Sequence, residues 1–344
     1  NASRVDEIKY EAQKNNIQLI PCGVRHLGTE KAFDVLKGMY DFLMEETNTE
    51  FSELTTARDI LVEDGRATGI VLQKRGEEPQ TVKCDYLVLA PGRDGAAWLT
   101  DQAGKIGIST FNNEVDIGVR VEVPNAIMDH LTKDLYEAKM VYYSDTFENK
   151  VRTFCMNPGG VVSEEHYDGK IAVVNGHSYA DPSLKTDNTN FAVLVSTRFT
   201  EPFHQPIEYG KYIAQLGNML TGGGIMVQRL GDLMLGRRTD ASRLRKSVTV
   251  PTLRSAIPGD LSYVLPQRYL TSITEALKAF DKLAPGLYGR DTLLYGVEVK
   301  FYSSKVEVSN QFETNVKNMY AIGDGAGITR GLIQASATGI VVAR

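Results

Sequence analysis

The chain has 344 residues, a length that corresponds to between one and three domains. Hydrophobic residues make up 42% and charged residues 24%, the usual mixture of a globular protein, which argues against a disordered or fibrous chain. The net charge of −5 lacks the basic excess of a nucleic-acid-binding protein, and no apolar run reaches the roughly 20 residues that span a bilayer.

The chain opens with sequence typical of helix and then strand. Residues 4–15 have the composition of a charged helix, and residues 17–21 that of a short strand. Residues 31–46 carry apolar side chains at the spacing of a helix buried on one face. Asn1 and Ala2 resemble the remainder of an expression tag. We therefore expect the chain to be part of a longer protein.

An antiparallel meander is predicted next. Short β-prone runs fill residues 51–83, and Asp64-Gly65 is a strong hairpin signal between two of them. Residues 85–90 are continuously apolar after Asp85, which predicts a strand buried on both faces. Pro91 and the glycine after it end that strand.

The remainder of the chain predicts a mixed region followed by a regular one. Helices and strands are intermixed between residues 96 and 290, which indicates a second, α+β domain. Strands are then expected at residues 293–300, 305–308 and 319–322, and a helix from Leu332.

The glycine-rich turn before this last helix is the strongest functional signal. A predicted buried strand ends in Gly323-Asp324, and a carboxylate at that position lies where open α/β sheets bind ligands. The glycines let the backbone approach a ligand closely, and the following helix presents free N–H groups. The alternative is an ordinary strand–turn–helix connection in which the aspartate caps the helix.

The longer string from Thr314 to Asp324 resembles the second flavin-binding motif of glutathione-reductase-type flavoproteins. In that superfamily the aspartate binds the ribitol of FAD, so the resemblance implies this role for Asp324. The cofactor-binding residues that it implies here are Gly323, Asp324, Gly325, Ala326, Gly327, Gly331 and Leu332.

A second segment agrees with this interpretation. Residues 85–93 resemble the superfamily's short motif in which a strand ends in Ala-Thr-Gly, although Pro91 stands in the place of the threonine. The resemblance adds Ala90, Gly92 and Arg93 to the expected cofactor-binding residues. The alternative is an ordinary buried strand with a Pro-Gly turn.

The Gly-x-Gly-x-x-Gly turn that holds the pyrophosphate in a FAD-binding Rossmann domain is absent from the sequence. We therefore expect an incomplete, Rossmann-like FAD/NAD(P)-binding domain whose N-terminal βαβ unit is missing. Such a fragment is expected to be largely free of cofactor and inactive.

Further segments resemble a widespread, poorly characterised family of bacterial and archaeal FAD-dependent dehydrogenases. The sequence departs from that family at Asn157, where a second cysteine often stands, and in the segment Ile328-Thr-Arg330. The segments that carry the resemblance are residues 26–31, 152–162, 175–178, 227–232 and 296–298.

Cys155 and His177 are the candidate catalytic residues. Cys155 leads into a Pro-Gly-Gly turn and is either a thiol near the flavin or a small buried side chain. His177 is either a proton donor or a structural loop residue. The three cysteines are an odd number and lie far apart, which favours a reducing, cytoplasmic setting. No metal-ligand spacing is present, so no metal site is predicted.

The sequence thus predicts an α/β protein with a discontinuous FAD-binding domain over residues 1–95 and 291–344. An inserted α+β substrate or cap domain is expected over residues 96–290. The predicted function is hydride transfer between FAD and an unidentified small-molecule substrate, with NAD(P)H as a candidate electron partner. The alternatives are a non-catalytic ligand-binding or interaction module, and an ene reductase acting on a lipid-like substrate, which would need a large apolar pocket.

Overall fold

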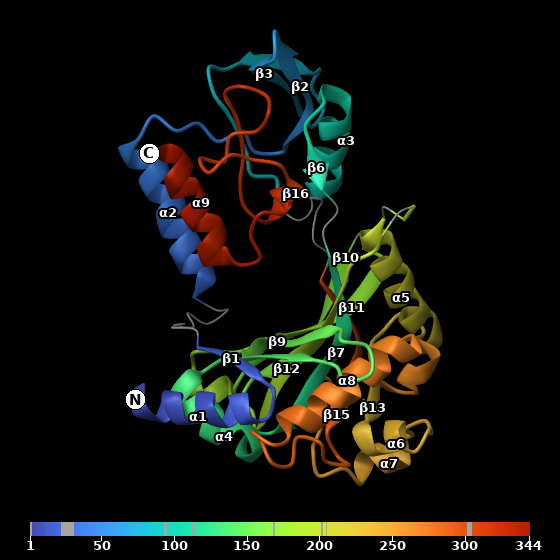
Figure 1. The fold of residues 1–344 in the computed structure, drawn as a ribbon. Coiled ribbons are helices and arrows are strands. Elements are labelled where there is room, and N and C mark those ends of the chain that lie inside the picture. Colours follow the sequence, from blue (N-terminus) through green and yellow to red (C-terminus); the bar gives the residue numbers. More distant parts are fainter. Residues whose placement is uncertain are drawn as a thin grey trace. The chain divides into compact units, whose positions relative to one another are not determined.

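The computed structural model forms two compact units, each built from three separate stretches of chain (Figure 1). Unit 1 comprises residues 1–38, 115–197 and 208–300, and unit 2 comprises residues 39–114, 198–207 and 301–344. The structure describes residues 2–21, 31–92, 95–111, 114–167, 169–200, 202–203, 205–300 and 305–344.

Unit 1 is built on an eight-stranded sheet in the order β1-β8-β9-β12-β7-β15-β13-β14. Seven neighbouring strand pairs make this sheet, and all are antiparallel except the last, between β13 and β14. The strands are β1 (Gln18–Pro21), β7 (Val115–Pro124), β8 (Ala138–Tyr143), β9 (Lys150–Asn157), β12 (Asn188–Thr197), β13 (Met226–Arg229), β14 (Ile257–Pro258) and β15 (Leu293–Lys300).

Helices cover one face of this sheet. The helix α8 (Gln267–Phe280) contacts four central strands, and α4 (Asn125–Leu135) contacts three of them. The buried positions Tyr269, Ile273 and Phe280 recur at helical spacing, so α8 presents one apolar stripe to the sheet. Burying each large apolar side chain of this kind stabilises the fold by roughly 1.5–3 kcal/mol.

A two-stranded hairpin packs over the opposite face. It consists of β10 (Val161–Tyr167) and β11 (Ile171–His177), which contact β7, β9, β12 and β15 between them. Its buried Val162, Ala172 and Val174 form an apolar cluster with Val227 and Tyr295 of the large sheet. The sheet of unit 1 is therefore covered on both faces.

The other helical elements of unit 1 lie around the sheet. The segment before β1 forms α1, which contacts β1 and α4. These elements are α1 (Ala2–Lys14), η1 (Pro182–Leu184), α5 (Pro206–Thr221), α6 (Leu230–Met234), α7 (Ala241–Arg245) and η2 (Leu261–Tyr263). Within the part of the chain that the structure describes, no helix is long and apolar enough to cross a membrane.

Unit 2 contains the predicted meander and two further strand pairs. The meander is confirmed, since its three strands pair antiparallel in chain order. A small core of buried residues from the meander, α3 and the last strands holds the unit together. The elements are β2 (Thr55–Glu63), β3 (Arg66–Lys74), β4 (Gln80–Lys83), β5 (Leu87–Leu89), α3 (Ala96–Ile106), β6 (Thr110–Phe111), β16 (Lys305–Val306), β17 (Met319–Ala321), η3 (Asp324–Ala326) and α9 (Leu332–Ala343).

Two predicted burial patterns are wrong. The helix α2 (Ala32–Glu46) forms where expected, but it buries none of its residues, and Phe33 is 71% exposed. The strand β5 was expected to be buried on both faces, yet Val88 is 46% exposed. The helix α9, for which no buried face was predicted, has an exposed Leu332 and buries only Thr338. Amphipathic spacing fixes which face of an element is apolar, but it does not supply the surface that covers this face.

The predicted fold class is confirmed at the level of a mixed α/β protein with a large mixed sheet. The predicted domain ranges stay a prediction, and the compact units are divided differently. Residues 1–38 belong to unit 1, because β1 pairs with β8. The strand β15 also belongs to unit 1, because it pairs with β7 and β13. The helix α3 belongs to unit 2.

Candidate functional site

One face of the large sheet in unit 1 carries buried charges. Along β7, valine and isoleucine alternate with Asp116, Gly118, Arg120 and Glu122, so the polar side chains share a single face. Asp116, Arg120 and Glu122 are all fully buried. Because burying an unpaired charge is very costly, each of these groups needs partners inside the protein.

Arg120 forms the centre of the buried charges. Its Nε donates to Oε2 of Glu298 at 2.8 Å, and its Nη2 donates to Oε1 at the same distance. The Nζ of Lys300 lies 3.0 Å from the same Oε1, so one carboxylate is shared by two cations. Burial opposes both charges, but their mutual attraction outweighs it, so the pKa of Arg120 is raised and the pKa of Glu298 is lowered.

The remaining N–H groups of Arg120 connect neighbouring strands. Its Nη1 donates to the carbonyl oxygen of Cys155 at 3.2 Å and to Oδ1 of Asn190 at 2.8 Å. Its Nη2 also lies 3.5 Å from Oδ1 of Asn175. The guanidinium is thus occupied on every side by β9, β11, β12 and β15, and we interpret it as the group that positions this cluster.

Cys155 has a left-handed backbone conformation, with φ of 49°. It lies in a β-bulge, because the register between β9 and β12 shifts at this point. Its N–H donates to Oε1 of Glu137 at 3.2 Å, and its carbonyl oxygen accepts from Asn157 Nδ2 at 2.9 Å in addition to Arg120. Bonds at both ends therefore fix a conformation that non-glycine residues rarely adopt. The side chain is half-buried, and Sγ lies 3.8 Å from Asn157 Nδ2.

His177 lies at the end of β11 and is half-buried. Burial lowers its pKa, the charge of Arg120 lowers it further, and the charge of Glu165 opposes both effects. The imidazole is therefore neutral at pH 7. A Cβ on the preceding Gly176 would lie 2.2 Å from Asn190 Oδ1, so only glycine lets β11 approach the cluster this closely.

Arg120 thus interacts with both candidate catalytic residues. It donates a hydrogen bond to the backbone carbonyl oxygen of Cys155, and its charge lowers the pKa of His177. The cluster also contains a fully buried polar atom, Nδ2 of Asn190, that has no hydrogen-bond partner among the described residues. Sequence reasoning did not identify Arg120, Glu298 or Lys300 as site residues, although Glu298 lies in a segment that carries the family resemblance. The signal that could have found Arg120 is the alternation of apolar residues with Asp116, Gly118, Arg120 and Glu122 in residues 115–124, and the residues Val297-Glu-Val-Lys300 alternate in the same way.

A second buried ion cluster lies at the end of β13 and in the segment that follows it, and it contains two arginines. Asp232 accepts from Arg229 Nε at 2.9 Å, from Arg237 Nε at 2.8 Å and from Thr239 Oγ1 at 2.8 Å. Burial would raise the pKa of Asp232, but these donors lower it to about 2. Both arginines are therefore held within the fold by this carboxylate.

The two flavin-motif segments are adjacent in unit 2. The strands β5 and β17 are parallel, with Met319 opposite Leu87 and Ala321 opposite Leu89. The turns that follow them are in contact, because a Cβ on Gly325 would lie 2.2 Å from the carbonyl oxygen of Gly92. Arg93, which was also expected to bind the cofactor, lies outside the described residues.

Asp324 follows β17 and is half-buried, and its Oδ1 accepts from Thr329 Oγ1 at 2.6 Å. Gly323 and Gly327 flank it with φ of 72° and 69°, a conformation that strongly favours glycine. Gly331 is extended and precedes α9, whose first residue, Leu332, is 86% exposed.

The other two expected cofactor-binding residues border these turns. Ala326 is fully buried in η3, whereas Ala90, at the end of β5, is exposed. Among the residues that the structure describes, no group of three histidine, cysteine or acidic side chains could hold a metal ion.

Comparisons with known proteins identify a family and one longer relative. A family model described as "FAD-dependent protein, C-terminal domain-like" matches residues 114–301, more than half of the chain. An uncharacterised protein of Clostridium beijerinckii is 28% identical over 361 aligned positions, which cover 98% of this chain and 62% of that protein. The chain thus spans less than two thirds of the length of this curated relative.

Solved structures show only distant likeness. An oxidoreductase from Methanosarcina mazei has a TM-score of 0.30 at 12% identity, over 84% of this chain and 47% of that one. A variant of the Escherichia coli quinol–fumarate reductase has a TM-score of 0.36 at 12% identity, over 99% of this chain and 54% of that one.

Proposed function

The chain belongs to the family described as FAD-dependent protein, C-terminal domain-like, and from this we propose that the intact protein is a FAD-dependent oxidoreductase. In this proposal unit 2 is part of a flavin-binding domain of the glutathione-reductase type. Unit 1 supplies the groups that act on the substrate. FAD, when bound, accepts or donates the hydride.

One observation carries the flavin proposal, namely the parallel pairing of β5 with β17. Two segments more than 200 positions apart each resemble a flavin motif, and the pairing brings their glycine turns into contact. If the likeness to a flavin motif were accidental in either segment, there would be no reason for the two segments to be neighbours in the fold.

The residues present fit the cofactor. The Asp324 carboxylate lies at the C-terminal end of a parallel strand, where α/β sheets bind ligands, and it can accept hydrogen bonds from ribitol hydroxyls. The glycines at positions 323 and 327 keep side chains away from the turn, and the start of α9 presents N–H groups suited to negative charge. Gly92 and Ala90 border the same turn.

On the substrate side we propose that Cys155 and His177 face the reacting molecule and that Arg120 is a positioning residue. The neutral imidazole of His177 can accept a proton at pH 7, or donate one from its N–H. Arg120 holds the backbone of Cys155 and lowers the pKa of His177 through its charge. NAD(P)H remains the candidate electron partner.

We propose in addition that the flavin site is completed by a further segment, which carries the pyrophosphate-binding glycine turn absent from these 344 residues. Two observations support this part. The chain aligns with only 62% of its longer relative. Several apolar side chains of α2 and α9 are also exposed in unit 2, among them Met39, Phe42 and Ile333.

The visible absorption spectrum tests the proposal. We expect a flavin spectrum from the chain extended upstream as its gene encodes it, and little or none from the 344 residues alone. In the extended protein, Asp324→Ala should lower the flavin content. Asp85→Ala is the matched control, since it removes an exposed aspartate near the other end of β5. Equal flavin content in the Asp324 variant and the wild type would contradict the site, and no flavin in any form would contradict the function.

A further inference from the structure

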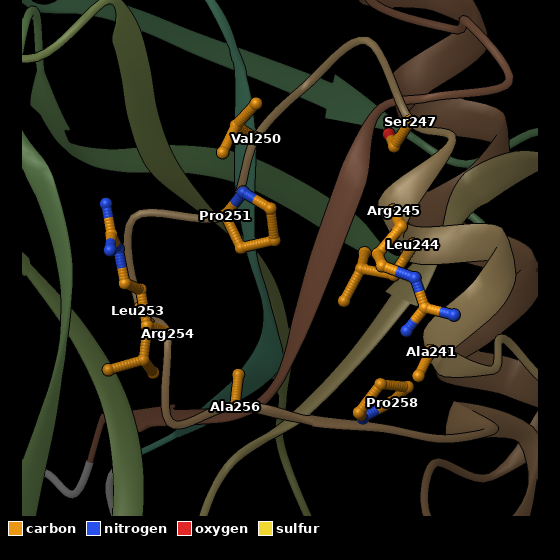
Figure 2. Close-up of a pocket in the computed structure, with 10 residues that line it drawn as sticks. All are labelled: Ala241, Leu244, Arg245, Ser247, Val250, Pro251, Leu253, Arg254, Ala256 and Pro258. Carbon is orange, nitrogen blue, oxygen red and sulfur yellow. The ribbon is translucent and has the colours of Figure 1, made fainter.

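A cavity of about 510 Å³ lies in unit 1 between α7 and the segment that leads into β14. This volume is in the range of ligand-binding pockets. The lining residues are Ala241, Leu244, Arg245, Ser247, Val250, Pro251, Leu253, Arg254, Ala256 and Pro258. In Figure 2, Arg245 lies on one wall with Leu244 and Ala241, and Arg254 lies on the opposite wall with Leu253.

The cavity is backed by the core of the unit. Leu244, Leu253 and Ala256 pack against the apolar cluster that joins the β10–β11 hairpin to the large sheet. Three of the apolar lining residues are therefore held in place by buried side chains behind them. Such a surface keeps its shape in the absence of a ligand, which lowers the cost of binding.

Hydrogen bonds fix the segment that contains Pro251. Thr252 donates from its N–H and its hydroxyl to the buried carboxylate of Glu122, and its hydroxyl also accepts from the N–H of Val162. The carbonyl oxygen of Val250 accepts from Asn188 Nδ2 at 2.8 Å. These bonds tie the wall between Val250 and Leu253 to β7, β10 and β12.

The charge of the cavity is uncompensated. Its lining contains two arginines and no acidic residue, so the formal charge is +2 in a chain whose net charge is −5. Neither Arg245 nor Arg254 forms an ion pair with a described residue, whereas Arg229, Arg237 and Arg243 nearby are each paired with an aspartate. A guanidinium beside apolar walls is suited to a carboxylate.

We propose that this cavity binds an organic anion that combines a carboxylate with an extended apolar body. The apolar body contacts Leu244, Val250 and Leu253, and the carboxylate pairs with Arg245 or Arg254. The ene-reductase alternative would also need an apolar cavity, but the proposal concerns binding alone. It therefore stands or fails independently of flavin content.

Isothermal titration of the chain with decanoate, decanol and inorganic phosphate tests the proposal at low salt. We expect decanoate to bind with a stoichiometry of one and more tightly than either other probe. Affinity for decanoate should fall at least about fivefold when both arginines are replaced, in Arg245→Gln/Arg254→Gln, because the charge-assisted hydrogen bonds are lost. Lys246→Gln, which removes a neighbouring exposed cation outside the lining, should leave it unchanged.

A second pair of variants tests the apolar part. Val250 and Val248 are both exposed, at 67% and 75%, but only Val250 lines the cavity. Val250→Asp should weaken decanoate binding, because it replaces an apolar contact with a charge that repels the carboxylate, and Val248→Asp should weaken it much less. Equal binding of decanol and decanoate, phosphate binding as tight as decanoate binding, or full affinity in the double arginine variant would each overturn the proposal.

Discussion

Arg120 and Glu298 are 178 positions apart in the chain, yet they form a bidentate ion pair in which both side chains are fully buried. The pair joins β7 to β15 at the point where the register between these strands shifts. Lys300 and Asn190 add contacts on either side of it. This pair fixes the charged face of the sheet, and the candidate catalytic residues are arranged around it.

Removing one partner of this pair should be strongly destabilising, because the other charge then stays buried with less compensation. We expect Arg120→Met to lower the free energy of unfolding by about 3–5 kcal/mol. The measurement is urea unfolding followed by circular dichroism. The matched control is Arg4→Met, which breaks an exposed pair with Glu7 and should cost less than about 1 kcal/mol. Equal losses in the two variants would show that the buried pair has no special importance.

The titration of His177 should respond to a single neighbouring carboxylate. Glu165 raises its pKa, so Glu165→Gln should move the NMR titration midpoint of the imidazole to lower pH. In the wild type the midpoint should already lie below the ordinary value of 6.5. Glu50→Gln, at an exposed position in unit 2, is the control and should leave it unmoved. An upward shift in the Glu165 variant would contradict the described environment.

Asp232 should make the free energy of unfolding of unit 1 fall at acidic pH. Its pKa is about 2 in the folded protein against an ordinary value of 3.8, so its contribution is fully present above about pH 4. It is lost as the pH falls through about 2, and the difference corresponds to about 2 kcal/mol. The stability advantage of the wild type over Asp232→Asn, measured by urea unfolding at successive pH values, should shrink in that window. An advantage that does not change between pH 5 and pH 2 would contradict the lowered pKa.

Gly325 should tolerate no side chain, because a Cβ there would lie 2.2 Å from a backbone oxygen of Gly92. We expect Gly325→Ala to destabilise unit 2 by about 1–3 kcal/mol through overpacking. The single tryptophan, Trp98 in α3, reports on unit 2 by fluorescence during urea unfolding.

Gly104→Ala is the matched control for this substitution. Gly104 lies in α3 with nothing near its Cβ position, so an alanine should stabilise the helix by roughly 0.5–1 kcal/mol. Similar stability in the two variants would show that the two turns are not in close contact.

Local elements were predictable from the sequence wherever a strong short-range signal was present. The meander follows from the turn at Asp64-Gly65, and the helix at residues 31–46 follows from its apolar spacing. The partners of the long strands were not predictable. Nothing near β15 in the chain indicates that it pairs with β7, because that pairing depends on side chains more than 170 positions away.

The candidate site shows the same limit. Cys155 and His177 could be singled out by residue type, but the left-handed conformation of Cys155 arises from a bulge opposite β12. Arg120 looked like one polar residue in a strand, and its importance comes from burial, which a single sequence does not reveal. The two flavin-motif segments, by contrast, could be recognised from the sequence, and the structure places them side by side.

Each unit is assembled from three stretches that alternate along the chain, and this has a consequence for how the protein is made and dissected. No single cut separates the two units, and no uninterrupted stretch of the gene encodes one complete unit without part of the other. During synthesis, β7 cannot pair with β15 in unit 1, and β5 cannot pair with β17 in unit 2, until the last stretch of each unit has been made, so neither unit can finish folding earlier. Experiments on one unit alone would require the chain to be rejoined in a new order.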